Sequence, residues 1–288
     1  MDSLLPLPIQ VDTRLHVDLF YHCCALLDLG ADAASLFSAD YAEGASRGRR
    51  ALGLESPPVE WLDELARLIA PVPSPHLLTL APLVVDSLPA LHELLTEAHG
   101  ARSVAPALDE VLQSAPARRF TSRLAALMDH ERPLVEALEE ASQQRVEQSV
   151  TGLRLFLAER CMPYLERLAR VLPSMQVDAW LCLGLPAGGR AASREGRVTV
   201  ALAMPAVPSE PFGTAFQLVH ELTHLATDPK VLRDGLSPRQ TREGTPGYAT
   251  HQALERAAHR FDMDLFAEPS EEFRLKYIRW ASRHGAYR

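Results

Sequence analysis

Apolar residues recur at spacings of three and four through almost all of the first 173 residues of this 288-residue chain. That spacing puts them on one face of an α-helix, so it predicts a helical region and leaves little room for strands. Prolines and glycines interrupt the pattern. We expect Pro133 in the first turn of a long helix, and Pro163 to end or kink that helix. The predicted helices are Leu15–Leu29, Pro58–Ile69, Leu83–Ala98, Leu108–Leu127 and Pro133–Cys161.

The pattern changes after Pro173. Two apolar, β-rich segments, 177–185 and 197–204, flank the turn-rich sequence PAGGRAASREG and predict two strands, paired antiparallel. A proline-rich connector then leads to a helix expected from Thr214 to about Asp228. The chain is therefore expected to be mainly α (α+β), with a helical domain of unknown role at 1–173 and a second domain at 174–288.

The segment VHELTHL (219–225) contains the motif H-E-x-x-H. On a helix, His220 and His224 lie one turn apart on the same face, so both imidazoles can reach one metal ion. Glu221 projects beside that ion, where its carboxylate can take a proton from a bound water. A buried helix that presents these polar groups needs a partner for them, and a metal ion supplies one.

A catalytic zinc site needs a third protein ligand and an open position for water. The residues after His224 (LATDPKVLRDG) offer no third histidine at short spacing, so a later segment must supply the ligand. Glu255 lies on the flank of a second predicted helix, with Pro246 in its first position. Glu243 and His251 are the other candidates, and an ordinary i,i+4 surface pair is the alternative role for His251 and Glu255.

Two stretches resemble known metallopeptidases. HELTHLATD (220–228) is similar to the corresponding stretch of thermolysin-like zinc peptidases, the gluzincins, and ERAAHRF (255–261) resembles the E-x-x-A-x-x-F helix of the ImmA/IrrE family. The resemblance extends over about residues 178–270, and it departs from that family at Asp262, where a small apolar residue is usual. It implies a small zincin-like catalytic region, with a short, mostly antiparallel sheet and the motif helix, packed on the helical N-terminal region.

The resemblance also implies a reaction. His220, His224 and Glu255 would hold Zn²⁺, and Glu221 would act as general base in a metallopeptidase that hydrolyses peptide or protein substrates. Strand 197–204 is expected to pair with an extended substrate. The candidates for a donor to the developing oxyanion lie on the second predicted helix: Tyr248, His251 and His259.

Two other functions fit the same residues. Two histidines and a carboxylate also hold Fe²⁺ in 2-oxoglutarate-dependent oxygenases that modify peptides. A regulatory or binding protein with a vestigial metal site is the second alternative, although a purely structural zinc site has no need of Glu221.

The net charge, the apolar runs and the cysteine spacing indicate which partners and which location to expect. The chain is 47% hydrophobic and 23% charged, with a net charge of −8, which argues against nucleic acid or an anionic membrane surface as partner. We expect no membrane span and no signal peptide, because no long apolar run exists and the N-terminus lacks a basic segment. The four cysteines form no C-x-x-C pair and predict buried thiols in a reducing compartment, so the expected location is the cytoplasm.

Overall fold

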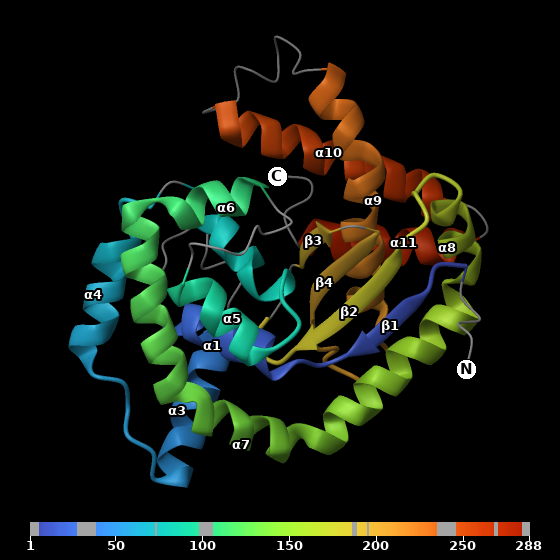
Figure 1. Ribbon diagram of the computed structural model, residues 1–288. Helices are drawn as coiled ribbons and strands as arrows, with labels where there is room; N and C mark the ends of the chain where they lie inside the picture. The colour runs from blue at the N-terminus through green and yellow to red at the C-terminus, as the bar shows by residue number, and fades with distance from the viewer. Residues whose placement is uncertain are drawn as a thin grey trace. The chain divides into compact units, whose positions relative to one another are not determined.

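The computed structural model describes residues 6–27, 39–72, 74–97, 106–185, 189–194, 196–234, 246–267 and 270–283 (Figure 1). The chain is mainly helical with one small mixed sheet. It divides into two compact units, each discontinuous in sequence: Met1–Gln10, Thr151–Val177 and Pro205–Arg288 form the first, and Val11–Val150 and Asp178–Met204 form the second. The division into a domain at 1–173 and a domain at 174–288, which the sequence predicts, stays a prediction.

The second unit contains most of the helices expected from the N-terminal pattern. Its apolar core includes Phe20, Leu91, Phe120 and Leu124, all at most 1% exposed. The predicted helix 58–69 is confirmed, and Leu83–Ala98 is shortened because a 3₁₀ helix precedes it. The helices are α1 (Leu15–Leu26), α3 (Ala39–Leu52), α4 (Val59–Ile69), η1 (Pro75–Leu83), α5 (Leu88–Thr96), α6 (Pro106–Gln113) and the larger part of α7 (Ala115–Arg160).

Helix α7 ends at Arg160, just before Cys161 and Pro163 as predicted, but it differs from the prediction at its start and at Pro133. The predicted helix 108–127 is broken at Ser114, whose hydroxyl accepts a hydrogen bond from the Ala117 amide at 3.3 Å and starts a new helix. That helix then continues through Pro133, so the expectation of a helix start there is wrong. Proline removes one backbone hydrogen bond but has a helical φ, and the ribbon of α7 bends in Figure 1, as is common for a helix containing proline.

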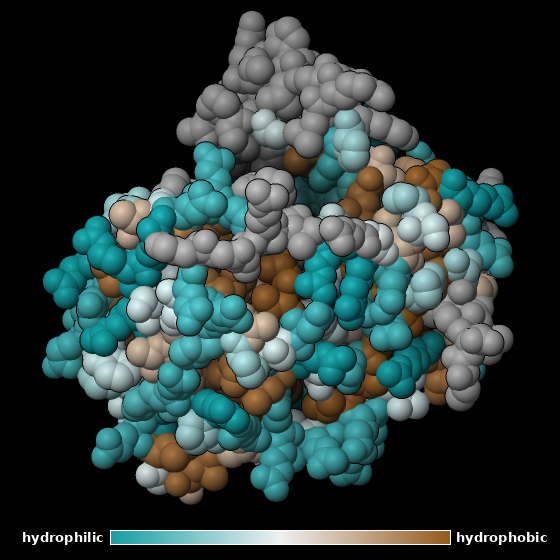
Figure 2. Space-filling view, in the orientation of Figure 1, coloured by the Kyte–Doolittle hydropathy of each residue, from teal (hydrophilic) through white to brown (hydrophobic). Residues whose placement is uncertain are grey.

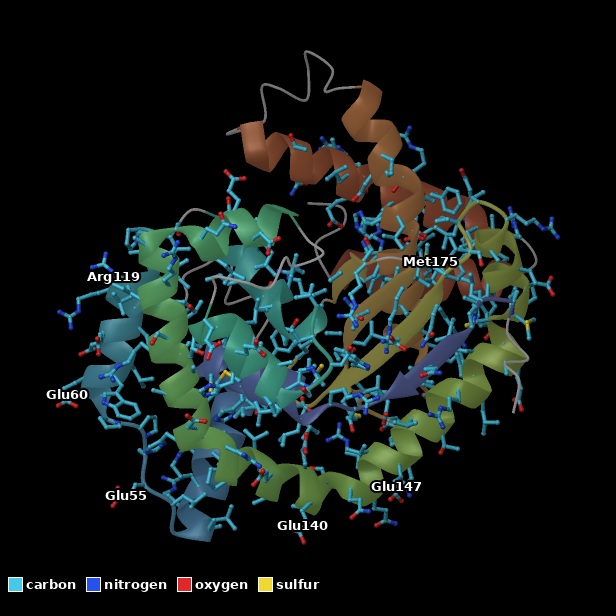
Figure 3. All side chains as sticks on the ribbon, viewed as in Figure 1. Glu55, Glu60, Arg119, Glu140, Glu147 and Met175 are labelled. Atoms are coloured by element: carbon cyan, nitrogen blue, oxygen red, sulfur yellow. The ribbon has the colours of Figure 1, made fainter. Side chains whose placement is uncertain are left out.

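The solvent-facing side of α7 carries charged residues of both signs. Glu140 and Glu147 are both exposed and lie seven residues apart, which is two helical turns. Figure 3 shows both side chains projecting outward from the helix.

The sheet has the strand order β1-β2-β4-β3, from β1 (Ile9–Asp12), β2 (Gln176–Cys182), β3 (Arg190–Arg194) and β4 (Arg197–Ala203). The two predicted strands exist as β2 and β4. A backbone hydrogen bond from Met204 to Cys182 joins their C-terminal ends, so they are parallel and the antiparallel expectation is wrong. The antiparallel partner of β4 is β3, which pairs Arg190 with Ala201 and Arg194 with Arg197.

Strand β3 lies in the stretch expected to be a turn, because its residues are mainly small or charged. Gly196, with φ of 76°, makes the tight turn from β3 to β4 that only glycine adopts easily. Strand β4 therefore has a neighbour on both sides. The expectation that 197–204 pairs with an extended substrate is wrong, because no edge of that strand is open.

The first unit contains α8 (Met162–Ala169), α9 (Phe212–Asp234), α10 (Pro246–Ala267) and α11 (Glu271–Arg283). Helices α9, α10 and α11 pack on one another, and α9 crosses α10 in Figure 1. Their core is a set of mutually stacked and edge-on rings: Phe156, Tyr164, Phe212, Phe216, Phe266, Phe273 and Tyr277.

The boundaries of these helices agree only in part with the sequence analysis. Pro246 begins α10, as expected. The motif helix α9 begins at Phe212, two residues before Thr214, and it continues past Pro229 to Asp234, so the predicted end at Asp228 is wrong. Gly152 of α7 is required for packing, because a Cβ there would collide with the backbone carbonyl of Pro208.

Three general properties concern the apolarity of the described helices, the four cysteines and the polarity of the face in Figure 2. None of the described helices is long and apolar enough to cross a membrane. All four cysteines are buried and unpaired with one another, as expected. On the face shown in Figure 2, hydrophobic residues are interspersed with hydrophilic ones, which is ordinary for a globular protein.

Candidate metal centre

Helix α9 presents two imidazoles from successive turns. The Nε2 atoms of His220 and His224 lie 3.3 Å apart, and the rings meet edge to face at 4.8 Å and 78°. His220 is 6% exposed, whereas His224 is half-buried. The i,i+4 spacing on a continuous helix is sufficient to bring both nitrogens to one point.

Glu255 of α10 completes a three-residue cluster with them. Its Oε2 lies 3.3 Å from His220 Nε2, and its Oε1 lies 3.5 Å from His224 Nε2. One ligand atom from each of the three residues falls within a 4.8 Å group. The structure therefore brings together the three residues that the sequence ranked first as metal ligands.

The other candidates cannot be placed in the same way. Glu243, the alternative third ligand, lies outside the described residues. The backbone of Tyr248 and His251 is helical within α10, but their side chains lie outside the described part of the structure. Their roles stay predictions.

The donor set fits a tetrahedral Zn²⁺ ion. Two ligands bound tetrahedrally at about 2.0–2.1 Å from zinc lie about 3.3–3.4 Å from each other. The spacing of 3.3 Å between the two Nε2 atoms matches this requirement, and each Nε2 has a different Glu255 oxygen at a similar distance, 3.3 Å for Oε2 and 3.5 Å for Oε1. Two imidazoles and one carboxylate are also the ligand types of catalytic zinc sites.

Asp262 holds the first imidazole in position. Its Oδ2 lies 2.8 Å from His220 Nδ1, and its Oδ1 accepts a hydrogen bond from the Thr223 hydroxyl at 2.7 Å. Asp262 is fully buried. An imidazole whose Nδ1–H is held by a carboxylate presents Nε2 as the ligand atom, which is the usual arrangement around zinc. The residue that departs from the resembled family therefore lies within the centre.

Asp228 does the same for the second imidazole. Its Oδ1 lies 2.9 Å from His224 Nδ1, one helical turn further along α9. This contact needs α9 to remain helical to residue 228 and beyond, which the structure shows. Both motif histidines are thus anchored at Nδ1 and point Nε2 at the same place.

A third imidazole lies beside the cluster. His259 is 8% exposed and stacks on His220, with ring centroids 4.3 Å apart and planes at 21°. Its Nε2 lies 3.8 Å from Glu255 Oε2, and its Nδ1 lies 2.5 Å from the Tyr277 hydroxyl. Of the three histidine and tyrosine candidates for an oxyanion donor, His259 is the one whose side chain is placed next to the metal ligands.

Charges in the cluster shift the pKa values in opposite directions. Although burial favours a neutral ring, hydrogen bonds to Asp262 and Glu255 raise the pKa of His220 to about 9. Asp228 and Glu255 likewise outweigh burial and raise the pKa of His224 to about 10. Burial would raise the pKa of Glu255, but the two imidazoles hold it well below its usual range. A divalent cation can displace the protons from the two imidazoles and bind to them and to the Glu255 carboxylate.

His259 behaves differently from the other two. Burial and the neighbouring charge of His220 lower the pKa of His259 to about 4, so its ring is neutral near pH 7. Glu221, between the two motif histidines, is half-buried and forms no hydrogen bond or ion pair with another residue that the structure describes.

The sequence analysis missed Asp228 and Tyr277 as parts of this centre. Asp228 is detectable, because it stands four residues after His224 on one helix face. Asp262 stands seven residues after Glu255, two helical turns along the same face of α10, so it too is detectable from the sequence. Tyr277 has no local signal, since it meets Asp262 only through the packing of α11 on α10.

Comparison with known proteins gives no relative: no protein-family model, no curated protein and no solved structure matches the chain.

Proposed function

We propose that the chain is a zinc-dependent metallopeptidase whose metal ligands are His220, His224 and Glu255 and whose general base is Glu221. The observation that carries the proposal is the convergence of one ligand atom each from His220, His224 and Glu255 within 4.8 Å of one another, with both histidines on the helix that also carries Glu221. Peptides or proteins are the proposed substrates. Resemblance to the zincins and the ImmA/IrrE family supports the proposal at the level of the two motifs.

Each residue has a defined task in this reaction. A bound Zn²⁺ ion lowers the pKa of a coordinated water and polarises a substrate carbonyl. Asp262 and Asp228 hold the two imidazoles so that each Nε2 keeps its lone pair directed at the centre. Glu221 accepts the proton of the attacking water at its carboxylate and passes it to the amine nitrogen that leaves.

The stacking of His259 supports a catalytic site over a closed structural one. A ligand imidazole binds a metal ion in its own ring plane. The rings of His220 and His259 lie in nearly parallel planes about one stacking distance apart, so one ion cannot lie in both planes. Among the described residues, the proposed ligands are then His220, His224 and Glu255, and the proposed mechanism assigns the fourth position to water and substrate.

The direct test compares Glu221→Gln with the wild-type protein on a mixed peptide library, with metal content measured in both. We expect Glu221→Gln to keep one bound metal and to lose turnover by at least about a hundredfold, because proton transfer is worth that much. Glu272→Gln, on the exposed face of α11, is the matched control and should keep full activity. Retained turnover in Glu221→Gln would remove the peptidase mechanism.

The same ligands would serve an Fe²⁺- and 2-oxoglutarate-dependent oxygenase. Metal analysis separates the two classes, because a peptidase should work with Zn²⁺ alone under anaerobic conditions. Turnover that requires oxygen and 2-oxoglutarate would replace hydrolysis with oxidation as the reaction. Peptide binding without turnover in the metal-loaded wild type would favour a regulatory protein.

A further inference from the structure

Tyr277 of α11 lies where two parts of the metal centre meet. It is fully buried, and its hydroxyl oxygen is 2.8 Å from Asp262 Oδ2 and 2.5 Å from His259 Nδ1. Asp262 in turn contacts His220. One hydroxyl thus links the imidazole of a metal ligand to the imidazole that stacks on it.

A count of protons fixes the direction of these hydrogen bonds. Asp262 accepts at both oxygens, from the Thr223 hydroxyl and from His220 Nδ1, so it is an ionised acceptor. Tyr277 has one proton, and the contact with Asp262 uses it. His259 Nδ1 must then donate to the Tyr277 oxygen, which leaves His259 Nε2 as the acceptor nitrogen of a neutral ring.

We propose that Tyr277 is a positioning residue of the metal centre: it fixes Asp262, and through it His220, and it sets which nitrogen of His259 carries the proton. This inference rests on the proposed metal site but not on the peptidase reaction. His259 Nε2, 3.8 Å from Glu255 Oε2, is then an acceptor beside the ligands, and it is not the oxyanion donor that the sequence offered as a candidate. Helix α11 therefore contributes a residue to the metal centre, in addition to packing against α9 and α10.

The geometry predicts an asymmetric effect of removing the hydroxyl. His220 is held by Asp262, which Tyr277 contacts, whereas His224 is held by Asp228. Tyr277→Phe should therefore loosen one ligand and leave the other in place. Loss of the outer partner of a ligand typically costs tenfold to a hundredfold in metal affinity, and we expect about tenfold here because His220 and Thr223 still hold Asp262.

The experiment uses the full chain loaded with Co²⁺ in place of zinc, and proton NMR of the exchangeable ring N–H signals shifted by the metal. The wild type should show one such signal each from His220 and His224. Asp228→Asn, which should alter only the second signal, assigns them. Tyr277→Phe should shift or broaden the His220 signal and leave the His224 signal unchanged, and Co²⁺ should bind about tenfold more weakly.

Two further variants keep the result interpretable. Tyr21→Phe also removes one buried tyrosine hydrogen bond, to the Thr79 carbonyl at 2.9 Å in the other unit, and should change neither signal nor affinity. Thr223→Val removes a different donor to Asp262, so it should move the His220 signal even if Tyr277→Phe does not fold.

The outcomes separate this inference from the proposed function. Unchanged signals and unchanged affinity in both Tyr277→Phe and Thr223→Val would overturn the positioning role while leaving the metal site intact. Failure of the wild type to bind Co²⁺ would instead remove the metal site on which both proposals depend.

Discussion

Metal binding should depend steeply on pH, because protons and a metal ion compete for the same two nitrogens. In the metal-free protein His220 and His224 have pKa values raised to about 9 and 10. Both values lie above pH 7, by about 2 and 3 pH units, so displacing the two protons at that pH costs roughly 3 and 4 kcal/mol. An imidazole with an ordinary pKa of about 6.5 would cost almost nothing at this pH.

The size of the effect follows from the number of protons displaced. Each proton released makes the apparent association constant rise tenfold per pH unit below the corresponding pKa. Because the two Nε2 atoms are 3.3 Å apart, protons on both repel each other, and we expect a slope between one and two decades per pH unit. The slope should fall toward zero above pH 9–10.

The assay is zinc binding by competition with a chelator of known pH dependence, from pH 6.5 to 8.5, together with proton release in weak buffer. Asp228→Asn should lower the slope, because Asp228 helps to raise the pKa of His224. A slope below about 0.3 decades per pH unit between pH 7 and 8.5 would refute the charged cluster that we describe.

Two further predictions concern the scaffold. Gly152→Ala should lower the free energy of unfolding in urea by about 1–3 kcal/mol, because the added Cβ meets the Pro208 carbonyl. The control Gly44→Ala places its Cβ in open space on α3 and should raise the free energy of unfolding by up to about 1 kcal/mol. A stabilised Gly152→Ala variant would contradict the packing described. Burial would raise the pKa of Glu131, but hydrogen bonds from His22, Arg49 and His130 lower it to about 2, below the usual 4.5. Its contribution of ~3 kcal/mol is then present above pH 4.5 and lost as pH falls through about 2, so Glu131→Gln should be destabilised at pH 7 and nearly equal to wild type at pH 2. An equal deficit at both pH values would show that charge is not the cause.

The sequence was most informative where one helix carries the whole signal. His220, Glu221 and His224 follow from a spacing within a single helix, and the position of Glu255 follows from a flank of a second one. Helix α4 was predicted because its apolar stripe is uninterrupted. In these cases local periodicity and the final packing agree.

Tertiary packing decided the remaining features. Pro133 and Pro229 each lie inside a helix because the surrounding turns compensate for one lost hydrogen bond, and propensity alone does not reveal that. Strand β3 lacks β-rich residues and is held by its pairing with β4. The contact of Tyr277 with Asp262 joins two helices and has no signature in either one.

The metal content of the chain tests the central claim most directly. Protein purified without added metal, then given one equivalent of Zn²⁺ and dialysed, should retain one zinc ion per chain. The variants His220→Ala and Glu255→Ala should retain almost none, and His251→Ala should retain as much as the wild type. A wild-type chain without zinc, or a Glu255→Ala variant that holds zinc as tightly as the wild type, would contradict the metal centre proposed for His220, His224 and Glu255.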